Sequence, residues 1–155
     1  MELRALINTA MKQAMRDKAT ARLSTVRLIN AAIKDRDIAA RAEGNDEGVD
    51  DAEVLAILGK MTRQRQESAR TYEEAGRFDL SERELAEIKV IEEFLPRQLS
   101  PEEIEAAIAD AVAATGASSI KDMGQVMAQL KSTHAGQMDF SAASQKVKAV
   151  LLGEG

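Results

Sequence analysis

The chain has 155 residues, of which 45% are hydrophobic and 30% charged, a balance typical of one ordinary globular domain or two small ones. It has no Cys, which excludes a disulfide scaffold, a thiol nucleophile and a cysteine zinc site, and it has no apolar stretch of membrane-spanning length. The net charge of −5 argues against indiscriminate nucleic-acid binding. The first residues resemble neither a signal peptide nor a transit peptide, so we expect a cytoplasmic location.

Two amphipathic helices are predicted at the start of the chain. Apolar residues recur at spacings of three and four over residues 2–16, and a broader apolar face follows over residues 18–41, with Asp17 as a candidate N-cap. Residues 42–50 concentrate Gly, Asn and Asp, which favours a mobile loop.

The next two helices are predicted from capping boxes. Asp50 and Glu53 start a helix of about 25 residues that ends before Gly76. The run Ser81-Glu82-Arg83-Glu84 predicts the start of the fourth helix, which stops at Pro96. Its apolar face is expected to contain Leu85, Ile88, Ile91, Phe94 and Leu95.

Three shorter helices are predicted in the remaining residues. The run Ser100-Pro101-Glu102-Glu103 places an N-cap serine, a proline at N1 and a glutamate at N3, so the fifth helix begins there. Gly116 ends it, Ser119 opens the sixth helix, and Asp139 precedes the seventh. Because no segment alternates like a strand, we expect an all-α fold. It would comprise a four-helix domain with two long helices over residues 1–95 and a three-helix domain over residues 96–155.

Charge is distributed in bands along the chain. Residues 1–41 hold nine Lys/Arg and four Asp/Glu, whereas residues 42–59 hold six acidic residues and no basic one. Arg27, Lys34 and Arg41 are spaced seven apart and therefore lie along one stripe of a helix. Solvated helix faces are the usual explanation of such bands, and nucleic acid is the one ligand class that this banding allows.

The residues of a catalytic site are missing from the sequence. The one histidine, His134, lies in a Ser-Thr-His-Ala-Gly turn and has no nucleophile and base arrangement around it. We interpret it as an exposed turn residue, with contact to the phosphate of a partner as the alternative. No Glu-x-x-His pair and no phosphate-binding glycine loop occurs. We therefore expect no catalytic residues, no metal and no small-molecule cofactor.

One charged residue falls on the apolar stripe of the third helix. Arg65 shares that stripe with Leu58 and Met61, and a half-buried arginine needs a carboxylate partner. Glu84 and Glu87 lie on or near the inner side of the fourth helix. We predict a structural ion pair between Arg65 and one of these two glutamates.

Short motifs throughout the chain carry a family resemblance. They are Gln64-Arg65, Tyr72, Ala75-Gly76-Arg77, Asp79-Leu80, Glu84, Glu87, Leu95-Pro96 and Lys121-Asp122-Met123-Gly124-Gln125-Val126-Met127. With these motifs the sequence resembles the YqeY family of small cytoplasmic bacterial proteins over nearly its whole length. Its C-terminal half is similar to the tail domain of the B subunit (GatB) of the glutamine-dependent aspartyl/glutamyl-tRNA amidotransferase.

The resemblance implies a binding function and no chemistry in the chain itself. In the amidotransferase the tail domain helps to hold tRNA, so a related protein is expected to be a tRNA-associated accessory module. Its expected partners are tRNA or a tRNA-modifying or aminoacylating complex. The label carbon–nitrogen ligase with glutamine as amido donor applies by kinship only. The alternative is a protein–protein adaptor with no RNA ligand, which would use the long helices as its docking surface.

The resemblance also implies which residues would contact tRNA. The matching region covers the sixth helix, the following turn and the seventh helix, and its candidates are Lys121, Lys131, His134, Lys146 and Lys148. Helix N-termini near Ser119 and Asp139 are expected to offer free amides to phosphate. Gly124 costs the sixth helix about 1 kcal/mol relative to alanine, so we interpret it as allowing the fifth or seventh helix to approach closely.

Overall fold

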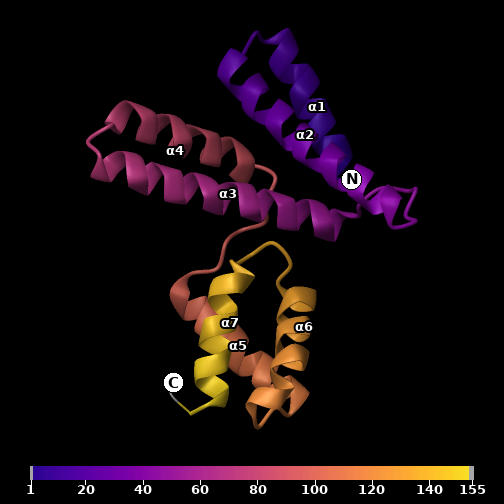
Figure 1. Ribbon diagram of the computed structural model, residues 1–155, viewed down its shortest axis with the longest axis vertical. Coiled ribbons are helices and arrows are strands. Elements are labelled where there is room, and N and C mark those ends of the chain that lie inside the picture. Colours follow the sequence, from indigo (N-terminus) through magenta and orange to yellow (C-terminus); the bar gives the residue numbers. More distant parts are fainter. Residues whose placement is uncertain (1, 154–155) are drawn as a thin grey trace. The chain divides into compact units, whose positions relative to one another are not determined.

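The computed structural model describes residues 2–153, which form seven α-helices, one short 3-10 helix and no strand (Figure 1). This confirms the all-α fold class. The chain divides into two compact units between Pro96 and Arg97, and each unit has its own apolar core. No helix within residues 2–153 combines the length and the apolar character that crossing a membrane requires.

The first unit consists of two helical hairpins (Figure 1). Its helices are α1 (Leu3–Arg16), α2 (Thr20–Ala42), α3 (Asp51–Glu74) and α4 (Phe78–Glu92). Ile7, Ile29, Leu58 and Ile91, one from each helix, are fully buried in the shared core. As predicted, the Asp50 carboxylate caps α3 and accepts a hydrogen bond from the amide of Glu53 at 3.0 Å.

The predicted starts of α2 and α4 are wrong. Asp17 is the C-cap of α1, and α2 begins only at Thr20. At the other turn, Gly76 adopts a φ of +74° and the amide of Arg77 donates to the carbonyl of Tyr72 at 2.8 Å. This compact turn lets α4 begin at Phe78, so Ser81 lies inside the helix, where it is 2% exposed.

The loop predicted for residues 42–50 lies between α2 and α3, and its last residues are anchored to the first unit. Val49 is 4% exposed and belongs to the core. Its amide donates to the Asp37 carboxylate at 2.9 Å, and its carbonyl accepts from the Arg4 guanidinium at 3.0 Å. Arg4 also pairs with Asp37, at 2.9 Å from Nη1 to Oδ2. One ion pair thereby fixes the segment that leads into α3.

The second unit contains α5 (Pro101–Thr115), the 3-10 turn η1 (Ile120–Asp122), α6 (Met123–Thr133) and α7 (Phe140–Leu151). Ile108, Val126, Leu130 and Val147 form the centre of its core. The predicted capping box at the start of α5 is confirmed: Ser100 Oγ accepts from the amide of Glu103 at 3.2 Å, and the glutamate side chain accepts from the amide of Ser100 at 3.0 Å.

Gly124 does not serve close packing, so that interpretation is wrong. A Cβ atom added at Gly124 would meet no heavy atom within 4 Å, and the residue is exposed on α6. The sequence cannot distinguish an open glycine from one under a neighbouring helix, because both fit the same helical pattern.

Candidate nucleic-acid interface

The arginine on the apolar stripe of α3 makes its ion pair with α4. Arg65 Nε lies 2.8 Å from Glu87 Oε2, and Arg65 Nη1 donates to the carbonyl of Met61 at 3.2 Å. The side chains of Arg65 and Glu87 are only 15% and 26% exposed. Of the two glutamates that the sequence offers, Glu87 is therefore the partner.

Glu84, the other glutamate, lies half-buried near this pair. Burial raises the pKa of the Glu84 carboxyl, the negative charge of Glu87 raises it further, and Arg65 opposes both by lowering it. Together these three residues form a polar connection between α3 and α4, in addition to the hydrogen bond that Ser81 Oγ donates to Glu73 Oε1 at 2.9 Å. The cluster serves the fold, since Arg65 is already occupied within the chain.

The four lysines proposed from the resemblance are all exposed in the second unit. Lys121 lies in η1, Lys131 in the last turn of α6, and Lys146 and Lys148 in α7. Lys146 and Lys148 flank the fully buried Val147, so they point about 200° apart around the axis of α7. Lys121 and Lys131 are ten residues apart, roughly 15 Å along η1 and α6. The structure does not gather the four lysines into one cluster.

Carboxylates accept hydrogen bonds from amides near the N-termini of both η1 and α7. The Asp139 carboxylate accepts from the amides of Ser141 and Ala142 at 2.9 and 3.4 Å, and Asp122 Oδ2 accepts from those of Ser118 and Ser119 at 2.9 and 3.2 Å. The expectation of free amides is therefore wrong at α7, where Asp139 caps two amides of the first turn, whereas Ser118 and Ser119 precede the first residue of η1.

His134 is held by a neighbour in its own turn. It is the C-cap of α6 and is half-buried, and its Nδ1 lies 3.0 Å from Oε1 of Gln137. The side-chain amide of Gln137 in turn donates to the carbonyl of Arg97 at 3.1 Å. His134 thus helps to order the turn between α6 and α7.

The α1–α2 hairpin carries the largest excess of exposed cations. Two of its basic residues are paired: Arg4 binds Asp37, and Arg22 binds Glu93, the C-cap of α4. The others are exposed and form no ion pair with any carboxylate among residues 2–153: Lys12, Arg16, Lys18, Arg27, Lys34, Arg36 and Arg41. The sequence signal for this surface is the heptad spacing of Arg27, Lys34 and Arg41.

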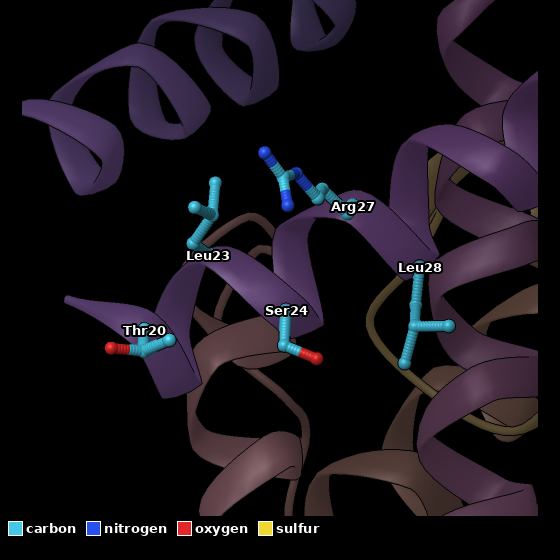
Figure 2. A pocket seen from close by; sticks show the side chains of 5 residues that line it. All are labelled: Thr20, Leu23, Ser24, Arg27 and Leu28. Carbon is cyan, nitrogen blue, oxygen red and sulfur yellow. The ribbon is translucent and has the colours of Figure 1, made fainter. Parts of the chain in front are cut away.

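A shallow hollow lies against the first half of α2 (Figure 2). It is lined by Thr20, Leu23, Ser24, Arg27 and Leu28. Figure 2 shows Leu23 and Arg27 extending to one side of the helix and Ser24 and Leu28 to the other. The hollow therefore combines two hydroxyl groups, one guanidinium and two leucines on a single helix.

Comparison with known proteins identifies the family of the chain. The family model described as Yqey-like protein matches residues 4–151, which is almost the whole length. No curated protein matches the chain. The family match confirms the resemblance that the motifs of the sequence indicate. The chain belongs to the YqeY family.

Proposed function

We propose that this protein is a tRNA-associated accessory module of the cytoplasm, which binds folded RNA and catalyses no reaction itself. In this proposal the second unit is a three-helix domain of the amidotransferase-tail type, and the link to glutamine-dependent tRNA amidation is one of kinship. The observation that carries the proposal is the set of seven exposed Lys and Arg side chains on α1, α2 and the turn between them, which form no ion pair within residues 2–153.

Charge on this hairpin supports RNA binding despite the net charge of −5. Affinity for a nucleic acid depends on cations that reach its phosphates, and acidic residues elsewhere weaken it only through screened, long-range repulsion. The acidic band over residues 42–59 belongs to the loop and to α3, whereas the hairpin of α1 and α2 holds nine Lys/Arg against three Asp/Glu. The local surface is therefore basic.

The C-terminal candidates remain part of the proposal as separate contacts. Lys121, Lys131, Lys146 and Lys148 are exposed and could each reach a phosphate, but the capped N-terminus of α7 adds no binding site. We therefore expect these lysines to contribute less to affinity than the hairpin does.

The test is a fluorescence-anisotropy titration of the full chain against labelled total tRNA at about 50 and 200 mM salt. If three phosphates are neutralised, affinity should fall roughly 40-fold between the two salt concentrations. A variant with all four C-terminal lysines changed to alanine should bind more weakly than the wild-type protein. Absence of saturable binding at about 50 mM salt would refute the proposal.

A specific observation also favours the alternative function as a protein adaptor. Leu28 and Ile38 are 44% and 53% exposed on α2, and Leu28 borders the hollow. Such side chains suit the apolar face of a partner helix. An apolar interface would change little between 50 and 200 mM salt, so the same titration with a protein partner distinguishes the two functions.

A further inference from the structure

We infer that the outer face of α2 is a binding site for the phosphate backbone of helical RNA. The contacts would come from Arg27, Lys34 and Arg41, which we name the α2 cationic row. The inference rests on the proposed function, and it adds both the surface that binds and the form of RNA that this surface fits.

The row is straight and rigidly supported. Each step of seven residues advances about 10.5 Å along the helix and turns only about 20° around it, so the three cations span roughly 21 Å on one side of α2. All three residues are exposed, whereas Ile29, Ile33 and Ala40 on the opposite side are buried. Buried packing therefore fixes the backbone beneath the row and leaves the charged groups in solvent.

The acidic residues of α2 do not neutralise the row. Asp37 is bound by Arg4 and by the amide of Val49, and these hydrogen bonds lower the pKa of its carboxyl. Arg41 also favours the ionised form of Asp37 through its charge, but it forms no ion pair with it. Asp35 is exposed about 100° around the helix from Lys34. The row therefore retains its charge for an external anion.

The chemistry of α2 favours a folded, helical RNA over a single strand. Single-strand binding sites combine cations with aromatic side chains on which bases stack, and the sequence of α2 contains no aromatic residue. The hollow that Arg27 helps to line also contains the hydroxyl groups of Thr20 and Ser24, and Figure 2 shows Ser24 on the other side of the helix from the Arg27 guanidinium. Hydroxyl groups and cations suit phosphates and ribose 2′-OH groups, by which proteins recognise RNA helices through shape.

The decisive experiment compares two variants with the same change in net charge. The first is Arg27→Ala/Lys34→Ala/Arg41→Ala, which removes the row. The second is Lys60→Ala/Arg70→Ala/Lys89→Ala, which removes three exposed cations from α3 and α4. Both full-length variants are titrated against labelled tRNA, an RNA duplex of about 20 base pairs and a single strand of the same length. Circular dichroism establishes that both variants are folded.

The row variant should bind tRNA and the duplex at least 10-fold more weakly at about 50 mM salt, and its log–log salt slope should be shallower by about two to three. The control variant should change affinity less than about 3-fold.

Equal losses in both variants would overturn the inference, and so would wild-type binding to the single strand as tight as binding to the duplex. If tRNA binding persists without the row and depends on the C-terminal lysines, the inference fails and the proposed function stands. If the row variant no longer bound a protein partner but still bound RNA as tightly as the wild-type protein, the inference would also be overturned. Absence of any RNA binding by the wild-type protein would refute both the inference and the proposed function.

Discussion

Arg65 of α3 and Glu87 of α4 are joined by a 2.8 Å hydrogen bond between Nε and Oε2, while the same guanidinium donates to the carbonyl of Met61 at 3.2 Å. The guanidinium of Arg65 thus donates hydrogen bonds both to its own helix, α3, and to the neighbouring helix, α4. Both side chains are largely withdrawn from solvent, so each charge has lost part of its hydration. The ion pair compensates for that loss, and removal of either partner would leave the other charge uncompensated.

We expect Glu87→Ala to lower the free energy of unfolding by about 2 kcal/mol, since it leaves the Arg65 charge half-buried without a carboxylate. Urea unfolding of Arg65→Ala, Glu87→Ala and the double variant measures the coupling between the two residues. A coupling energy of at least about 1 kcal/mol is expected. Additive effects of the two single changes would show that the pair contributes nothing to the hairpin.

Glu84→Gln is expected to stabilise the protein at neutral pH. The pKa of the Glu84 carboxyl is raised by burial and by Glu87, so the folded state disfavours the ionised form. In the wild-type protein, ionisation of Glu84 therefore destabilises the folded state. This destabilisation is absent well below the ordinary glutamate pKa and develops as the pH rises through and above that value. The gain from Glu84→Gln should therefore be largest at pH 7 and shrink toward pH 4, as measured by urea midpoints. Glu82→Gln, at an exposed position of the same helix, is the control. A loss of stability in Glu84→Gln at pH 7 would show that attraction to Arg65 dominates.

Helix ends were predictable where the signal acts within one turn. Ser100 and Glu103 satisfy each other locally, so their pattern identifies the start of α5 without knowledge of the rest of the fold. Ser81 has the same pattern but lies inside α4, where its hydroxyl donates to Glu73 Oε1 at 2.9 Å across the α3–α4 turn. A tertiary contact between two helices thus replaces the local cap.

The candidate sites were predictable only to the level of residue type. A half-buried arginine requires a carboxylate, which limits the partners of Arg65 to two glutamates, but the choice of Glu87 depends on how α3 packs on α4. Likewise, helical periodicity places Arg27, Lys34 and Arg41 on one stripe, and only the packed hairpin shows that this stripe is exposed. No pattern in the sequence shows that the space around Gly124 is open.

Gly48→Ala should destabilise the first unit by about 1–2 kcal/mol or more. Gly48 has a φ of +89°, and a Cβ atom there would lie 2.9 Å from Asp37 Oδ1 and 3.1 Å from Arg4 Nη2. The substitution therefore adds backbone strain and also displaces the ion pair that anchors Val49. Gly44→Ala is the matched control, because Gly44 has a φ of +97° with nothing within 4 Å. Equal losses in thermal unfolding would show that strain alone matters.

Gly124→Ala should raise the free energy of unfolding by up to about 1 kcal/mol, because alanine favours the helix and its methyl group meets open space. Gly116→Ala should have the opposite effect, since Gly116 ends α5 with a φ of +68° that disfavours residues with a Cβ atom. Thermal unfolding of both variants tests the pair. A destabilised Gly124→Ala protein would restore the close-packing interpretation.

Glu103 should titrate at about pH 2. Two hydrogen bonds from the Arg97 guanidinium, at 2.9 and 2.7 Å, and a third from the amide of Ser100 favour its ionised form and lower its pKa to about 2. Because the folded-state pKa lies below the ordinary value of 4.5, the stabilisation is fully present above pH 4.5 and is lost as pH falls toward 2.

NMR titration of the Glu103 carboxyl measures this pKa directly, and Arg97→Ala should move the titration midpoint back toward the ordinary value. The neighbouring Glu102, exposed on the same turn, serves as the internal control. A wild-type Glu103 that titrates near 4.5 would show that the Arg97 bridge does not persist in solution and that the α5 cap is held by Ser100 alone.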